Sequence, residues 1–192
     1  RQQRWGVRTQ QLQQALDRFL PRQSSRQAQA WRAALTLAFC ALLRGGEVGV
    51  TSGESFDQLR HLNRADLRVV RARDGRLLLK LKMRVLKGRV LTGKTVTVLV
   101  GAGGTLLDAV REVIEYLQMD PVAEEDEAST PLFRHGDGSA FSREDVAAMV
   151  KRLMQGIGLD PTFFGAHSLR IGGATAALAA GIAPSLIRVM GR

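Results

Sequence analysis

The chain has 192 residues, of which 45% are hydrophobic and 24% charged; this is typical of a globular domain and excludes wholesale disorder. Its 28 lysines and arginines outnumber its 18 aspartates and glutamates, which gives a formal net charge of +10. This balance is typical of proteins that bind nucleic acid or another polyanion, although a basic surface can also serve solubility alone. The single cysteine, Cys40, allows no internal disulfide and indicates an intracellular protein. No uncharged apolar segment approaches membrane-spanning length, so we expect no membrane partner.

The first 32 residues contain seven arginines and one acid, Asp17. A helix is expected to begin near Thr9 and to end before Pro21, which cannot continue it. We interpret residues 1–23 as a basic linker or arm from a missing N-terminal domain, and residues 24–192 as the domain itself. A solvated helix detached from a missing neighbour would have the same composition. We expect both ends of the sequence to be cuts in a longer protein.

An apolar helix follows, with Ser24 or Ser25 as its cap and the Gly45-Gly46 pair at its end. Arg44 is then expected at the C-terminal end of this helix, where the helix dipole favours a cation. A plain C-terminal cap is therefore one interpretation of Arg44. The other is a functional arginine whose guanidinium is held by Glu47 in a bidentate pair.

The middle of the chain predicts a three-stranded antiparallel meander. Its strands are expected at residues 67–70, at residues 77–84 after the Asp74-Gly75 turn, and at residues 95–100 after a wider turn over Lys87–Lys94. In the second strand, basic residues alternate with Leu79, Leu81 and Met83, so one face should be dry and the other basic. The basic side chains of this region are Lys80, Lys82, Arg84 and Lys94.

The last third of the chain predicts helices with recognisable caps. Thr105 with Asp108, and Ser142 with Asp145, have the spacing of capping boxes. A helix over residues 168–180 follows Gly165, and a short helix is expected to begin near Pro184.

His167 and Arg170 fall at the start of the helix over residues 168–180, on one side of it. A helix start presents free N–H groups and a partial positive charge, so a histidine and an arginine there form a suitable seat for a phosphate. His61 and His135 are expected at the surface, without a cysteine or acid at metal-ligand spacing. No paired carboxylates suggest a two-metal site.

Four ordered segments resemble the catalytic domain of the tyrosine recombinase (phage integrase) family. They are LLRGGEV, ADLRVV at the opening of the sheet, PLF, and HSLRIGGATAALAAGI followed by MGR. The Ile-Gly-Gly-Ala-Thr continuation is similar to recombinases of DIRS-type retroelements. The resemblance covers residues 24–192 and implies an α+β fold, mostly helical with a small three-stranded antiparallel sheet.

The resemblance also implies a reaction, in which a tyrosine attacks a DNA phosphodiester, leaves a 3′-phosphotyrosyl link, and the strands are later rejoined. No metal, nucleotide or other cofactor takes part. Arg44 and Arg170 would neutralise the non-bridging oxygens, since guanidinium groups are planar forks that do not titrate near neutrality. His167 would bind the same phosphate and assist proton movement, and a hairpin lysine would be the general acid. We favour Lys87 over Lys82 for that acid; Lys80, Lys82, Arg84 and Lys94 are expected to meet backbone phosphates.

The resemblance implies double-stranded DNA as partner, with a tetramer on DNA for a complete protein and a monomeric fragment without DNA. It implies a nuclear location in a eukaryote and otherwise the cytoplasm or nucleoid. The family's nucleophilic tyrosine follows the Gly-Arg at which this sequence stops, so we expect the fragment to be truncated before it and inactive alone. Tyr116, the only tyrosine, lies far upstream of His167 and is not expected to be the nucleophile. The alternatives are a non-catalytic DNA-binding relative that has lost the nucleophile, and an unrelated basic RNA-binding domain.

Overall fold

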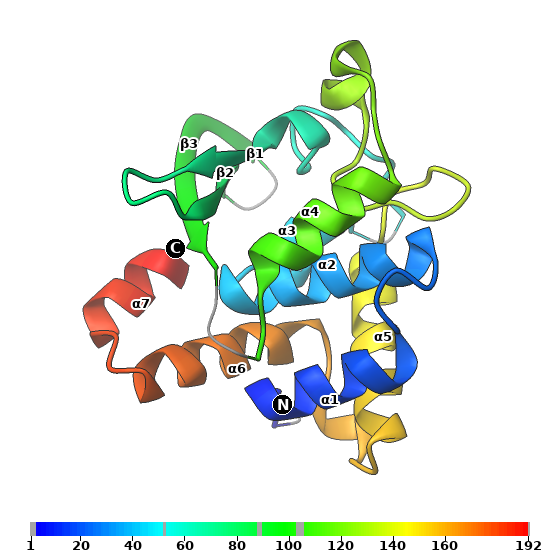
Figure 1. Ribbon diagram of the computed structural model, residues 1–192, viewed down its shortest axis with the longest axis vertical. Coiled ribbons are helices and arrows are strands. Elements are labelled where there is room, and N and C mark those ends of the chain that lie inside the picture. Colours follow the sequence, from blue (N-terminus) through cyan, green and yellow to red (C-terminus); the bar gives the residue numbers. More distant parts are fainter. Residues whose placement is uncertain (1–2, 52, 88–89, 103–105, 192) are drawn as a thin grey trace.

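The computed structural model describes residues 3–51, 53–87, 90–102 and 106–191, and its description of side chains also leaves out residues 86, 87 and 90. Its α-helices are α1 (Thr9–Phe19), α2 (Arg26–Cys40), α3 (Gly45–Val48), α4 (Ala109–Met119), α5 (Arg143–Gly156), α6 (Ala166–Ala179) and α7 (Pro184–Gly191). Short 3-10 turns are η1 (Arg64–Asp66), η2 (Glu124–Ser129) and η3 (Pro161–Phe163), and the strands are β1 (Leu67–Arg71), β2 (Leu77–Lys87) and β3 (Val90–Gly101). The helices form the body of the molecule, and the sheet lies at one end of it, with α7 nearby (Figure 1). The predicted fold class, mostly helical with a small three-stranded antiparallel sheet, is confirmed.

The N-terminal segment that we expected to be an arm contains helix α1, which packs against α5 and α6. Leu12, Ala15 and Leu16 are buried in the same core as the remaining helices. Ahead of α1, the N–H of Trp5 donates to the carbonyl of Phe163 at 2.9 Å, and the N–H of Val7 donates to that of Ser168 at 3.0 Å. We call residues 4–7 the strap, because they lie across the start of α6.

Helix α2 is the central element of the core. Its cap is Ser25, whose side chain accepts a hydrogen bond from the N–H of Ala28 at 3.0 Å. The predicted end at Gly45-Gly46 is wrong, because α2 ends at Cys40 and Leu42 takes a left-handed φ of 53°. The chain turns there, and Arg44 becomes the N-cap of the separate helix α3. Arg44 is therefore not at the C-terminal end of a helix, and the helix dipole does not explain its position.

The sheet has the predicted meander order, β1-β2-β3, with every pair antiparallel. Leu79, Leu81 and Met83 are buried whereas Lys80 and Lys82 are exposed, so the dry and basic faces of β2 are confirmed. The second turn is narrower than predicted: β2 continues to Lys87, which pairs with Val90, and Lys94 therefore lies inside β3. Strand β3 thus extends through Gly93, one of the glycines from which the wider turn was predicted.

Of the two predicted capping boxes, that of α5 is confirmed and that of α4 is not. Ser142 and Asp145 form the expected capping box of α5, and Asp108 caps α4. Helix α4 begins at Ala109, later than predicted, and Thr105 lies outside the described residues. Within the described part of the chain, no helix is both long and apolar enough to cross a membrane.

Candidate functional site

His167 and Arg170 lie on the first turns of α6. Gly165 is the N-cap, and its N–H donates to the hydroxyl of Ser168 at 3.1 Å. The ring of His167 faces the exterior, since the residue is exposed. The guanidinium of Arg170 is partly buried, and it donates from Nη1 to the carbonyl of Leu42 at 3.3 Å and from Nη2 to the carbonyl of Gly191. These bonds tie α6 to the end of α7 and to the turn that precedes Arg44.

Arg44 reaches the same region from the start of α3. Its side chain is about half exposed (49%), and Nη1 lies 3.2 Å from Glu47 Oε1. Glu47 Oε2 accepts the backbone N–H of Arg44 at 2.7 Å. Glu47 therefore holds Arg44 through both of its oxygens, Oε1 at the guanidinium and Oε2 at the backbone N–H.

A close contact between α3 and α6 brings Arg44 and His167 into one region. A Cβ built on Gly45 would lie 2.7 Å from the Cβ of Ala166 and 3.2 Å from Cγ of Arg143. Only glycine allows this approach, since real Cβ contacts are almost never so short. Arg44 precedes Gly45 and His167 follows Ala166, so this contact places the two side chains in one region.

The pKa of His167 also indicates that the cationic residues lie close to this ring. Its pKa is lowered by partial burial of the ring first, and then by the positive charges of Arg170, Arg44 and Arg143. The structure therefore brings three of the predicted residues together, namely Arg44, His167 and Arg170. It adds Arg143, which sequence reasoning missed because a basic residue after a capping serine has no signal of its own.

The basic residues of the sheet divide into two groups. Lys80, Lys82 and Lys94 are exposed, as expected for side chains that could meet a backbone. Arg84 differs, since its Nη1 forms an ion pair with the buried Asp66 and donates to the carbonyl of His61 at 3.4 Å. Arg84 therefore ties β2 to η1, and its contact with a DNA phosphate stays a prediction. Lys87 ends β2, and its side chain lies outside the described residues.

Tyr116 is completely buried, and its hydroxyl donates to Asp120 Oδ2 at 3.1 Å. Burial raises the pKa of this phenol to about 12. A hydroxyl in this position cannot approach a phosphodiester, in agreement with the expectation that Tyr116 is not a nucleophile.

The other two histidines are not the surface residues that we expected. The ring of His135 packs on Phe141 with centroids 4.7 Å apart, and its Nε2 lies 3.1 Å from Asp145 Oδ2. His61 accepts the N–H of Asp57 on Nδ1 at 3.0 Å. Among the described residues, no group of three or more His, Cys, Asp or Glu side chains is placed to hold a metal ion.

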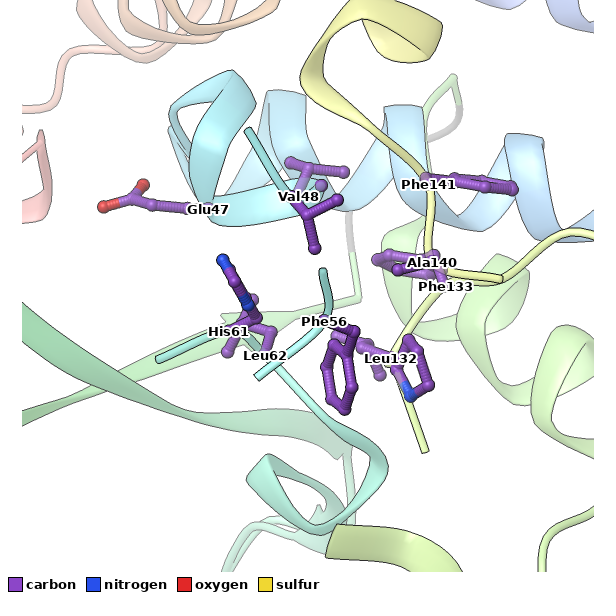
Figure 2. Close-up of a pocket in the computed structure, with 12 residues that line it drawn as sticks. Glu47, Val48, Phe56, His61, Leu62, Leu132, Phe133, Ala140 and Phe141 are labelled. Carbon is purple, nitrogen blue, oxygen red and sulfur yellow. The ribbon is translucent and has the colours of Figure 1, made fainter. Parts of the chain in front are cut away.

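A small cavity lies behind α3. It measures about 10 Å³, room for roughly one water, and includes His61, Phe56 and Phe133 in its wall. Figure 2 shows the carboxylate of Glu47 pointing away from the apolar side chains that line the cavity. The cavity therefore does not contain the cationic site.

No family model matches the sequence, and no curated protein matches it. The structure is similar to the XerH site-specific recombinase bound to its difH substrate in a pre-cleavage complex, with a TM-score of 0.65, 16% identity, and coverage of 98% of this chain and 47% of that chain. It is also similar to XerH bound to palindromic difH in a post-cleavage complex, with a TM-score of 0.66, 16% identity, and coverage of 97% and 46%. The chain thus spans about half the length of these proteins. It has the fold of a tyrosine recombinase domain.

Proposed function

We propose that this chain is the catalytic domain of a site-specific recombinase, which binds duplex DNA and positions one phosphodiester for strand cleavage and rejoining. The observation that carries the proposal is the convergence of Arg44, from the start of α3, with His167 and Arg170, from the start of α6. Two guanidinium groups and an imidazole gathered at helix starts suit a single phosphate group.

Each residue has a distinct role in this proposal. Arg44 and Arg170 bind the non-bridging oxygens, where the pentacoordinate transition state gathers negative charge. His167 binds the same phosphate, and because its pKa is lowered in the free protein its ring can take up a proton there and return it. The hairpin supplies the general acid for the leaving 5′-oxygen, which we assign to Lys87 in preference to Lys82. No metal or nucleotide takes part in the proposed step.

The nucleophile separates this proposal from its rival. Tyr116 is the only tyrosine of this sequence, and it is buried. Cleavage through a 3′-phosphotyrosyl link therefore requires a tyrosine from outside these 192 residues. The same observation favours the rival function, a DNA-binding relative without cleavage activity. In either case we propose a monomeric chain in the absence of DNA, and for the recombinase a tetramer on DNA.

The test is duplex binding measured by fluorescence anisotropy between 50 and 200 mM salt. Loss of one phosphate contact lowers the slope of log K against log salt by about 0.9, which is roughly tenfold in affinity near 0.1 M. We expect Arg44→Ala and Arg170→Ala each to produce a loss of about this size. The melting temperature should stay unchanged in Arg44→Ala and fall in Arg170→Ala, because the Arg170 guanidinium also ties α6 to α7 and to the turn before Arg44. The matched control is Arg18→Ala, which removes the same charge from the last turn of α1. This turn is at the opposite end of α1 from the strap, which lies across the start of α6.

Equal losses in Arg18→Ala and in the two site variants would contradict a specific phosphate site. Equal or tighter binding of single-stranded RNA would favour the RNA-binding alternative. On denaturing gels of labelled nicked duplex, we expect no covalent adduct from this chain; an adduct that disappears in Tyr116→Phe would refute the assignment of the nucleophile.

A further inference from the structure

We propose that Arg143 binds the DNA backbone at the phosphate next to the one held by Arg44, His167 and Arg170, so that the site clamps two successive phosphates of one strand. This inference rests on the function proposed above. It concerns a residue for which neither the sequence motifs nor the resemblance gave a role.

The position of Arg143 is fixed by contacts between the end of α3 and the start of α5. The N–H of Val50 donates to the carbonyl of Phe141, and the N–H of Arg143 donates to the carbonyl of Val50, both at 2.8 Å. A Cβ on Gly49 would lie 2.6 Å from the carbonyl oxygen of Phe141, so the two segments meet backbone to backbone. Helix α5 therefore begins at a place determined by α3, the element that also carries Arg44.

The side chain of Arg143 runs along this junction towards the site. Its Cγ lies 3.2 Å, and its Cδ 3.9 Å, from the point where a Cβ on Gly45 would stand. Gly45 follows Arg44 directly and is the residue that packs against Ala166. The aliphatic stem of Arg143 thus packs beside the cationic residues, while the residue as a whole is exposed and its guanidinium can reach a ligand.

The electrostatic surroundings of Arg143 favour an anion. It is the first residue of α5, where the partial positive charge of the helix start makes a cation unfavourable. Arg44, Arg84 and Arg134 each pair with a carboxylate, whereas no ion pair of Arg143 occurs within the described residues. Asp145 is occupied by the N–H of Ser142 at 2.8 Å and by His135, and Glu144 is exposed. A bound phosphate would relieve the repulsion between Arg143 and the helix start.

The neighbouring phosphate fits better than a shared one. Arg44 begins at the N-cap of α3, and His167 and Arg170 lie on α6, whereas Arg143 is the first residue of α5, so its guanidinium approaches the site from a third helix, beside the phosphate seat. A strand presents its charged groups at regular intervals, and a cation beside an occupied phosphate site therefore meets the next one.

The test compares Arg143→Ala with Arg143→Lys and with Arg152→Ala. Arg152 is exposed on the same helix, nine residues further on and about half a turn around it, so its removal is a matched change of charge. We expect Arg143→Ala to weaken duplex binding about tenfold at 0.1 M salt and to lower the salt slope by about 0.9, and Arg143→Lys to restore the slope. In the free protein, the imidazole pKa of His167 measured by NMR should rise in Arg143→Ala and stay unchanged in Arg152→Ala.

The outcomes separate the two proposals. If Arg44→Ala and Arg170→Ala weaken binding while Arg143→Ala behaves like Arg152→Ala, the role of Arg143 is refuted and the proposed function stands. If the unaltered chain does not bind duplex DNA, or if all these variants bind alike, the proposed function fails and the role of Arg143 fails with it.

Discussion

At the level of single residues, His167 is unusual because it stands among cations. Partial burial and the charges of Arg170, Arg44 and Arg143 all disfavour its protonated form, so its pKa lies below the ordinary value of 6.5. A bound phosphate brings negative charge to the same place and favours protonation. Binding of DNA should therefore be accompanied by uptake of a proton at this ring.

This coupling predicts tighter binding at lower pH. The free protein resists protonation of His167 until the pH falls below 6.5, whereas the complex accepts the proton at a higher pH. Between the two pKa values the affinity for duplex DNA should increase as the pH falls, by at most about tenfold per pH unit because one proton is involved. We expect titrations from pH 7.5 to 5.5 to show this slope, and His167→Gln to abolish it.

His61→Gln is the control for this measurement, because the pKa of His61 is also lowered, by burial first and by Arg60. Its ring lines the cavity behind α3, and the charges that act on it are those of Arg60, Glu54 and Asp57. A slope that persists in His167→Gln and disappears in His61→Gln would show that another histidine carries the proton.

At the level of elements, the sequence predicted best where a local signal and burial agree. The capping box of Ser142 and Asp145 marks the start of α5, and the apolar side chains that recur at helical spacing after it are buried: Val146, Met149, Val150, Leu153 and Met154. Likewise, Gly165 before Ala166 gives a local signal for the start of α6, and the alternation of basic and apolar residues gives one for strand β2.

Prediction failed where tertiary contacts decide. No residue of the ALLRGGEV segment signals that Leu42 adopts a left-handed conformation, which leucine rarely takes, and so the separation of α2 from α3 was missed. Arg143 was missed because its place in the site depends on the contacts of Gly45 and Val50, which are distant in sequence. The residue types of the site were predictable, and the packing that brings them together was not.

The glycine pair of α6 allows a close approach that sets the position of His167. A Cβ on Gly172 would lie 1.8 Å from the carbonyl oxygen of Val7 in the strap, and one on Gly173 would lie 2.1 Å from that of Phe39 in α2. Both obstacles are backbone atoms, which cannot move aside as a flexible side chain can. Helix α6 therefore packs directly against the backbone of the strap and of α2. This packing is possible because Gly172 and Gly173 have no side chain.

Gly172→Ala should accordingly destabilise the protein by about 3 kcal/mol or more, the upper range for overpacking, measured by urea unfolding. Gly46→Ala is the control, because a Cβ at Gly46 meets nothing within 4 Å and its φ is not positive. Since alanine restricts the unfolded chain more than glycine does, that variant should be neutral or slightly stabilised. Equal stability of the two variants would contradict the packing described for α6.

At the level of the whole molecule, the buried carboxylate of Asp120 joins elements that are distant in sequence. It ends α4 and pairs with Arg26 of α2 at 2.9 Å, with Arg134 before α5 at 2.8 Å, and with Arg64 of η1. Burial alone would raise its pKa, but the hydrogen bonds from Arg134 and Arg26 and the charge of Arg64 hold the pKa of Asp120 well below its usual range. The helical body and the turn η1, which leads into the sheet, thus share one anionic centre.

Removal of this charge should therefore affect the fold and not only one contact. Asp120→Asn leaves three guanidinium groups around a neutral amide, and we expect a loss of about 3–5 kcal/mol in the free energy of unfolding. Glu125→Gln, at an exposed position of η2, is the control and should change stability by less than about 0.5 kcal/mol.

Because the pKa of Asp120 is lowered in the folded state, its contribution to stability is complete above the ordinary carboxyl pKa near 3.8 and declines as the pH falls below it. The variant should thus lose part of the acid sensitivity of the unaltered chain, and an unchanged stability profile between pH 7 and pH 2 would show that the arginines find other partners.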